Sequence, residues 1–405
     1  MLNKQLFSSF LLTLFIIQPI YGIERASFSV DKIVVQDWEL KEIDLSFFDI
    51  QDPKQQFVLS SKQLSFPEPF SDIKLFDIRC QKFSWNANKI ICQQGKGNIK
   101  SKIITTPPFS FSFSVTEKKS RFSIKNLNIA KGKFSILAKQ KGDYWHIILK
   151  SRDLHLKDLQ VYLKKFDFGI DETKGKMNAN IEAKGKGGNL HQVLIKTLFD
   201  SVSLQANQGK VAMESVAFKL DLFVTKKKEG WFWENKNHIT KGEIYVEPFY
   251  MEVKDRGLHI NSYGVRAKKG DFSVDKFEFI HPDVMNIHAS ATVKSNIQDP
   301  IESARIITTI DDLETFSTTY ISPFLEQTEL EGIKLKGQVK SIINISQSAI
   351  QDVVSEIISV DVVDDKQRVS VESATGIINW TNNQDSNLAS VIKWDKINLF
   401  AIPID

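Results

Sequence analysis

The stretch Phe109-Ser-Phe-Ser-Phe-Ser-Val-Thr116 alternates apolar and hydroxyl side chains over its whole length. Successive side chains of a β-strand point to opposite faces, whereas a helix would distribute the same residues around its axis. The stretch therefore predicts a strand with one polar face and one apolar face. Its apolar face would consist of Phe109, Phe111, Phe113 and Val115.

A longer alternation runs from Val211 to Val224 and changes phase near Ser215, which predicts a β-bulge or bend at that point. Beyond the phase change, its apolar face would consist of Val216, Phe218, Leu220, Leu222 and Val224. Similar patterns predict further strands over residues 28–35, 127–137, 145–149, 177–183, 244–253, 272–280, 287–293 and 333–345. The chain is therefore expected to be mostly β.

Turn sequences separate these segments at short intervals, as in Lys141-Gly142-Asp143 and Lys269-Gly270-Asp271. Such turns join neighbouring antiparallel strands, whereas parallel strands need long crossover connections. We therefore predict a long antiparallel meander. Helical spacing is limited to a few short segments that begin near Asp158, Asn189 and Asp311, the last of them broken by Pro323.

A short phrase recurs along the chain. The sequences FSVDKIVV from Phe28, FSIKNLNI from Phe122 and FSVDKFEF from Phe272 begin alike. A repeated structural unit and the chance recurrence of Phe-Ser alternation in a Phe-rich β protein explain this equally well.

A sheet with one apolar face must bury that face, and the predicted helices are too few to cover it. Residues 23–405 could form tandem β-sandwiches, a closed barrel, or one long sheet curled into an elongated trough that holds acyl chains. Periodicity alone does not choose among these arrangements. The trough is our leading prediction, with two halves meeting near residues 185–206, and tandem sandwiches are the alternative.

The first twenty-two residues, MLNKQLFSSFLLTLFIIQPIYG, predict an export signal. Lys4 precedes an apolar run from Leu6 to Ile17, which is shorter than the roughly 20 residues that a spanning helix needs. We therefore expect a periplasmic protein whose leader is cleaved after Gly22. An uncleaved inner-membrane anchor is the alternative.

Cys80 and Cys92 are the two cysteines of the chain. The segment between them resembles two short strands around a turn at Asn86 to Asn88, and pairing about Asn86 would set the cysteines opposite each other. In an oxidising compartment we predict a disulfide across this hairpin, worth on the order of 3 kcal/mol. Two buried free thiols are the alternative.

No pattern in the sequence supports an enzyme, a metal site or a cofactor. The histidines lack metal-ligand spacing, no nucleophile elbow is present, and Asp311-Asp312 and Asp364-Asp365 are better explained as a helix start and a turn. The net charge of +4 comes from nearly balanced acids and bases, and the bases are mostly lysines scattered at predicted turn tips. Because arginine is scarce and no basic stripe carries interleaved aromatics, a nucleic-acid partner is not expected.

Several phrases, in this order, resemble a known family: LSFPEPFSDIKLFDIRC, KGEIYVEPFYMEV, LHINSYGVRAKKGDFSVDKFEFIHPD and SATGIINW. They are similar to the AsmA-like proteins, most of all to the YdbH-type branch, which is related in architecture to TamB. The resemblance runs from about Leu45 to Trp380. It implies a β-trough of the Gram-negative envelope that carries phospholipid from the inner to the outer membrane, and it transfers no individual site residue.

The chain is shorter than this resemblance implies. A further segment, or proteins of the inner or outer membrane, would therefore be expected to complete a bridge between the membranes. The leading functional prediction is conduction of phospholipid without catalysis, in which the apolar faces at 109–115 and 216–224 contact acyl chains. The alternative is a structural or adhesive exported module in which both faces are dry core, and an exported hydrolase is a weaker third hypothesis.

Overall fold

A computed structural model describes residues 24–35, 38–50, 55–65, 75–100, 108–165, 169–254, 257–295, 300–326, 328–382, 389–399 and 402–404. The predicted export signal lies outside these residues. The chain divides into two compact units: unit 1 is Met1–Phe168 with Lys176–Val193, and unit 2 is Gly169–Gly175 with Leu194–Asp405. Strands β11 (Ile170–Lys186) and β12 (Asn189–Ala206) contribute residues to both units.

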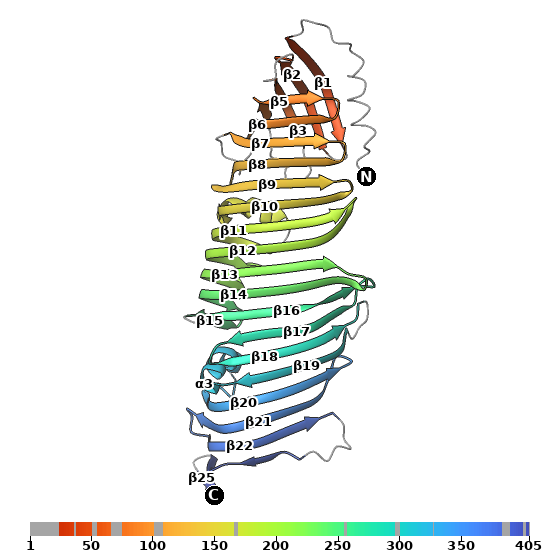
Figure 1. The fold of residues 1–405 in the computed structure, drawn as a ribbon. Helices are drawn as coiled ribbons and strands as arrows, with labels where there is room; N and C mark the ends of the chain where they lie inside the picture. The colour runs from red at the N-terminus through yellow and green to blue at the C-terminus, as the bar shows by residue number, and fades with distance from the viewer. Residues whose placement is uncertain are drawn as a thin grey trace. The chain divides into compact units, whose positions relative to one another are not determined.

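The other described elements of unit 1 are consecutive strands and one helix (Figure 1). They are β1 (Arg25–Val35), β2 (Trp38–Phe48), β3 (Gln56–Ser65), β4 (Leu75–Cys80), β5 (Phe83–Asn86), β6 (Lys89–Lys100), β7 (Phe109–Thr116), β8 (Lys119–Ile129), β9 (Gly132–Lys141), β10 (Tyr144–His155) and α2 (Leu156–Lys165).

Unit 2 also consists mainly of consecutive strands, with a short 3-10 helix and one longer helical segment between its described strands. Its elements are η1 (Asn207–Gly209), β13 (Val211–Lys226), β14 (Gly230–Val246), β15 (Phe249–Val253), β16 (Leu258–Ala267), β17 (Phe272–His281), β18 (Met285–Val293), β19 (Ile301–Ile310), α3 (Leu313–Phe316), η2 (Ser317–Ile321), α4 (Ser322–Leu325), β20 (Ile333–Ser346), β21 (Ala349–Asp364), β22 (Val369–Thr381), β23 (Val391–Lys393), β24 (Lys396–Leu399) and β25 (Ile402–Ile404).

Strands that follow one another in sequence pair antiparallel within each unit, which confirms the predicted meander. Among the described strands, three places depart from simple succession. In unit 1, β4 and β5 lie end to end along β6. In unit 2, both β15 and β16 pair with β14, and both β23 and β24 pair with β22. Among the described residues no second sheet packs on either unit, and the sheet is open rather than closed on itself. Tandem sandwiches are therefore not the architecture.

A line of left-handed residues crosses the strands of each unit and bends them. Inside the described strands, the polar residues with positive φ are Glu42, Asn126 and Asp153 in unit 1, and Ser201, Ser215, Ser359 and Ser373 in unit 2. A left-handed residue inside a strand makes a β-bulge, which kinks the strand and increases its twist. The predicted phase change at Ser215 is one of these bulges, because the pairing of β13 with β14 shifts between Glu214 and Phe218.

Each of these seven residues is followed directly by a buried apolar side chain. The buried residues, with exposed fractions of 1 to 7%, are Ile43, Leu127, Leu154, Val202, Val216, Val360 and Ala374. On some strands a glycine takes the left-handed position. Gly242 is one of them, and a Cβ on this residue would lie 2.5 Å from the Cα of Val216 on β13. The bulges therefore form the inside corner along which each sheet curls, and the strands of unit 2 curve visibly in Figure 1.

The curl of unit 1 closes around a phenylalanine cluster, which we define as Phe47, Phe57, Phe83, Phe111 and Phe113. Between β3 and β7 lie two strand positions, so a flat sheet would separate Phe57 from Phe113 by roughly 14 Å. Their ring centroids are 6.1 Å apart. The faces of β3 and β7 have therefore turned toward each other. Phe83 packs against Phe57 with centroids 5.0 Å apart.

The predicted disulfide between Cys80 and Cys92 is present, but the register that suggested it was wrong. Asn86 pairs with Lys89, so Cys80 lies opposite Gly95 and Cys92 lies opposite Phe83. The irregular step between β4 and β5 brings the two cysteine Cα atoms within 5.9 Å. Both sulfurs are buried in the same core as Phe57 and Phe83.

Of the three predicted helices, two form and one does not. Helix α2 forms around Asp158, and the segment α3–η2–α4 begins at Asp312, whose Oδ1 accepts hydrogen bonds from the backbone N–H of Glu314 and Thr315. The segment passes into a π-helix before Pro323, which lies at the start of α4 rather than breaking a helix. The helix predicted from Asn189 was wrong, because that stretch is strand β12.

The spacing of Leu190, Leu194 and Leu198 fits one helix face, but these residues also share one face of a strand. Residue Phe199, on the opposite face, stacks on Phe218 of β13 with centroids 4.2 Å apart. Tertiary pairing therefore overrides the local helical pattern, and Leu198 remains 51% exposed. No helix among the described residues is long and apolar enough to span a membrane.

Candidate functional site

One face of the sheet of unit 2 is apolar, and we call it the inner face. Directly opposed residues of antiparallel strands point to the same side, so the strand register traces rows of side chains across the sheet. One row across nine strands consists of Leu222, Asn235, Ser262, Phe277, Ala289, Ile306, Ile343, Val353 and Trp380.

Two flanking rows have the same character. The first consists of Leu220, Asn237, Ile260, Phe279, Ile287, Thr308, Ser341, Ser355 and Ile378. The second consists of Val224, Trp233, Gly264, Val274, Ala291, Ala304 and Ile345. None of the three rows contains a charged side chain, and their polar members are small and uncharged.

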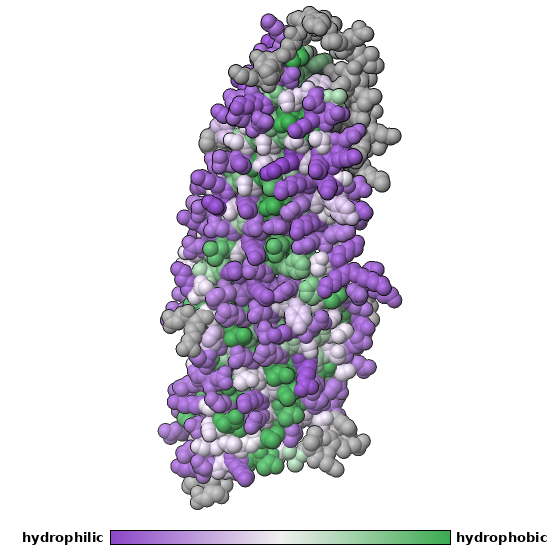
Figure 2. Space-filling model, viewed as in Figure 1, coloured by the Kyte–Doolittle hydropathy of each residue, from purple (hydrophilic) through white to green (hydrophobic). Residues whose placement is uncertain are grey.

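Charged residues of the same strands lie on the other side, the outer face. They include Lys219, Asp221, Glu234, Lys236, Lys276, Glu278, Arg305, Lys340, Asp352 and Glu356. Several of them pair along the sheet, as Lys276 does with Glu278 at 2.7 Å. The side of the molecule shown in Figure 2 is mostly hydrophilic, with apolar residues among the polar ones. The two faces of the sheet therefore differ sharply in charge.

Most inner-face side chains are half-buried, as in the runs around Leu222, Phe277 and Ile343. A dry core would bury them fully, and an open solvated face would expose them. The curl of the sheet shields them in part, while no second layer of described residues packs over the rows. The inner face of unit 2 is therefore apolar, half-buried and free of charge, and we call it the groove from here on.

The helical segment α3–η2–α4 packs at the bend side of this groove. Leu313 and Phe316 contact the buried side chains of Met285 and Ile310, and Phe324 packs edge-on against Phe249 with centroids 4.8 Å apart. Strands β16 to β19 do not extend past the bend, since β16 and β18 begin there and β17 and β19 end there. The helical segment packs on the buried side chains at these strand ends.

One histidine and one tyrosine tie this segment to the sheet. His281 Nδ1 lies 3.0 Å from the Tyr320 hydroxyl. Burial lowers the pKa of His281 and raises the pKa of Tyr320 to about 12, so both side chains are neutral near pH 7. The pair therefore adds no charge to the groove, and its role is to anchor the helical segment.

Unit 1 has an inner face of the same kind on β7 to β11. One row consists of Phe113, Phe122, Ala138, Ile147 and Ala183, and the next of Phe111, Ile124, Ile136, Leu149 and Ile181. These rows are also without charge. At their β7 end the phenylalanine cluster closes the face, so the open part lies over β8 to β11.

The nine predicted lipid-contact residues divide by burial. Phe109, Phe111 and Val216 are buried at 4, 5 and 1% exposure. The rings of Phe109 and Phe111 lie directly over Gly97 and Gly95 of β6, where a Cβ would come within 2.3 and 2.4 Å of them. Val115 is 43% exposed. The half-buried members are Phe113, Phe218, Leu220, Leu222 and Val224.

Sequence reasoning missed most of the groove. Phe277, Ile306, Ile343 and Val353 belong to the central row, yet only Leu222 of that row was proposed. The apolar alternation of residues 339–345 was a usable signal, but bulges at several strands hide which segments share a face. Among the described residues no group of histidine, cysteine, aspartate and glutamate is placed to hold a metal ion.

Comparison of the chain with protein-family models, curated proteins and solved structures finds no match in any of the three. The architecture and the side chains of the groove are therefore the basis on which its function is argued.

Proposed function

We propose that the protein binds and conducts phospholipid acyl chains along the apolar inner face of its sheet, without a catalytic step. The observation that carries this proposal is the set of three charge-free rows across β13 to β22, half-buried and without a covering layer among the described residues. A polypeptide sheet that needed only solubility would not keep charge off one face alone.

The energetics of transfer suit such a groove. Burying each CH2 of an acyl chain contributes about 0.8 kcal/mol, but a bilayer already provides the same burial. Net affinity for lipid is therefore small, and the groove acts by lowering the barrier to crossing water. Side chains that recognise one headgroup are not required, which fits three rows without a charged side chain.

The predicted leader and the resemblance to AsmA-like proteins support a setting for this activity. In that setting the protein works in the periplasm and moves phospholipid between the inner and outer membranes, with inner- or outer-membrane proteins or a further segment at the ends of the path. The leader and this resemblance rest on the sequence alone.

A structural or adhesive role is the second candidate, and the phenylalanine cluster of unit 1 favours it. Phe109 and Phe111 are packed as closely as residues of an ordinary core. A module built throughout in this manner would bind no lipid. The half-buried face of unit 2 is what separates the two candidates.

Native mass spectrometry of protein purified without detergent tests the proposal, with organic extraction to identify what is retained. We expect phospholipid to copurify with the wild-type chain. A glutamate in the groove should remove it, so Ile306→Glu and Ile343→Glu are the test variants. Ile307 and Ile342 are opposed on the outer face of the same two strands, so Ile307→Glu and Ile342→Glu are matched controls. A folded wild-type protein without lipid would contradict the proposal.

A further inference from the structure

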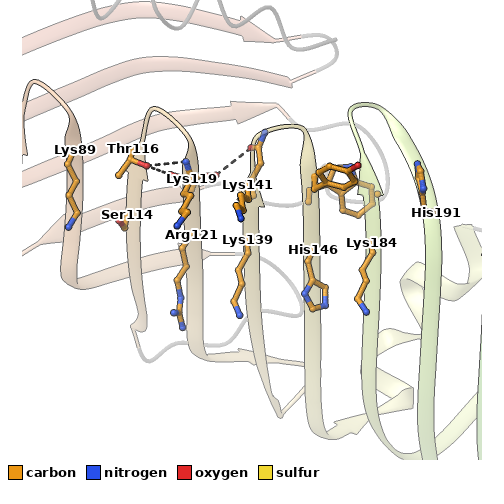
Figure 3. Close-up of a pocket in the computed structure, with 15 residues that line it drawn as sticks. Lys89, Ser114, Thr116, Lys119, Arg121, Lys139, Lys141, His146, Lys184 and His191 are labelled. Carbon is orange, nitrogen blue, oxygen red and sulfur yellow. Dashed lines mark hydrogen bonds between the residues drawn. The ribbon is translucent and has the colours of Figure 1, made fainter.

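Basic side chains form two rows on the outer face of unit 1. Four consecutive strands, β8 to β11, each contribute one residue to each row. The first row consists of Arg121, Lys139, His146 and Lys184, and the second of Lys119, Lys141, Tyr144 and Lys186. Figure 3 shows Arg121, Lys139, His146 and Lys184 side by side, each on its own strand.

The positive charges of these rows are not neutralised within the described part of the chain. No carboxylate there forms an ion pair with Arg121, Lys139 or Lys184, and the acid that reaches the first row is Glu182, whose Oε2 lies 3.4 Å from His146 Nε2. Like charges directly opposite each other destabilise a sheet. Two adjacent rows of them are therefore a cost that an anionic partner would remove.

Seven of the eight residues of the rows, all except Lys186, line a shallow depression of about 800 Å³ on the surface. Lys89, Ser114 and Thr116 extend it on the β6 and β7 side, and Trp145 and His191 border it near the strand ends. Tyr144, at the hairpin tip, is 61% exposed, and the Lys186 ammonium lies 5.1 Å from its ring centroid. Tyrosine beside lysine is common where proteins meet the membrane–water interface.

We propose that these basic rows are a docking surface for the phosphate-bearing face of an anionic phospholipid bilayer. Charge complementarity and breadth are the grounds: the cations are spread over four strands on a shallow surface, which suits a plane of phosphates better than one enclosed ligand. Lysine predominates, and its ammonium acts as a flexible point charge rather than a rigid fork. Protein interfaces are depleted in lysine, so a bilayer fits better than a protein partner.

Sedimentation of the full chain with vesicles tests this surface. The probes are vesicles of phosphatidylcholine alone and of phosphatidylcholine mixed equally with phosphatidylglycerol. We expect binding to the anionic vesicles that weakens as salt is raised, because exposed charges are screened within about a Debye length. Each Lys or Arg near an anionic surface contributes about fivefold, so the triple variant R121Q/K139Q/K184Q should bind on the order of a hundredfold more weakly.

The matched control removes the same charge from exposed lysines of unit 1 outside the rows, as K82Q/K133Q/K157Q. We expect it to bind clearly more tightly than the triple variant. Equal losses of vesicle binding in the two variants would overturn the proposal. Wild-type binding that is the same with and without phosphatidylglycerol would also overturn it, and would leave an acidic protein as the remaining occupant. Circular dichroism confirms that both variants are folded.

This inference does not depend on lipid conduction. Retention of lipid by the groove is measured by native mass spectrometry without vesicles, whereas docking is measured as the difference between anionic and neutral vesicles. A protein that docks but carries no lipid would contradict the proposed function alone. A protein that carries lipid but does not distinguish the two vesicles would contradict the docking surface alone.

Discussion

The phenylalanine cluster of unit 1 and the inner face of unit 2 arise from the same alternation of apolar and polar residues, but they end in different states. In the cluster, Phe57 reaches Phe113 across two intervening strand positions, with centroids 6.1 Å apart, and Phe111 is 5% exposed. In unit 2, Leu222 and Phe277 occupy equivalent faces and stay half-buried.

Curvature explains the difference. Alternation decides which side of the sheet is apolar. The tightness of the curl decides whether side chains on that side contact side chains from strands that are not neighbours. In unit 1 the step between β4 and β5, together with Gly95 and Gly97, lets the rings settle on the backbone of β6. In unit 2 the bulges bend the strands, but Leu222 and Phe277 are left half-buried. A sealed core and an open groove thus follow from one pattern.

Truncation of a buried ring should have the largest effect on stability. Phe111→Ala is expected to lower the free energy of unfolding by about 3 to 5 kcal/mol, because it removes a ring that has no space to refill. Leu222→Ala, in the groove, should cost about 1 kcal/mol, because that side chain already contacts solvent. Urea denaturation measures both variants. Equal costs would mean that the two regions are packed alike.

Loss of the disulfide should have the next largest effect on the free energy of unfolding, and it should destabilise unit 1. Cys80 and Cys92 close a short loop within the core of unit 1, and unit 2 contains no cysteine. Cys80→Ser with Cys92→Ser is expected to cost about 3 kcal/mol by the loop-closure estimate. Hydrogen exchange should show the loss in β3 to β7, while the strands after β12 keep their protection. Uniform loss across the chain would contradict this assignment.

A bulge substitution should have a smaller effect and should act on the bend of unit 2. Gly242 has φ of +116°, and its Cβ would lie 2.5 Å from the Cα of Val216, so Gly242→Ala is expected to cost about 2 kcal/mol. Gly142 also has positive φ but faces open space at a hairpin tip. Gly142→Ala should cost about 1 kcal/mol. Thermal denaturation compares the pair, and a larger loss at Gly142 would argue against the bend as a packed corner.

Acid should give the smallest effect, again in unit 2. The Arg368 guanidinium donates to Asp364 at 2.6 Å and holds the pKa of that carboxyl well below its ordinary value of 3.8. Because the folded pKa is the lower one, this contribution to stability is complete above 3.8 and is lost as pH falls toward the folded value.

Denaturation midpoints measured at decreasing pH test that sign. Asp364→Asn should flatten the acid limb of the stability profile. The matched control is Asp365→Asn, which removes a half-exposed carboxylate from the same turn, and it should keep the wild-type profile. A steeper acid limb in Asp364→Asn would show that the carboxyl is not stabilised in its charged form.

The sequence predicted the class of fold because strand alternation at 109–116 and turns such as Lys141-Gly142-Asp143 are local signals. It did not predict the register, since Cys80 and Cys92 are joined although neither lies opposite the other. Leu190 to Leu198 fitted a helix equally well until pairing partners were known. Which strands share the groove depends on contacts between distant segments.

One regularity was nevertheless readable in part. Phrases such as Glu42-Ile-Asp-Leu45, Asn126-Leu-Asn-Ile129, Ser201-Val-Ser-Leu204 and Ser215-Val-Ala-Phe218 each place a left-handed polar residue before a buried apolar one. Of the three Phe-Ser phrases, FSIKNLNI contains one of them, at Asn126. The basic rows of unit 1 could not be predicted, because Arg121, Lys139 and Lys184 become neighbours only through the register.

Site-specific photocrosslinking in cells tests the central claim, that the inner face of the sheet contacts acyl chains and its outer face does not. A photoreactive residue replaces Leu222 or Ile343 on the inner face, and Lys219 or Ile342 on the outer face, in cells grown with labelled phosphate. The account predicts labelled phospholipid attached at Leu222 and Ile343 and none at Lys219 and Ile342. No labelling at any of the four positions in a folded protein, or equal labelling of both faces, would contradict it.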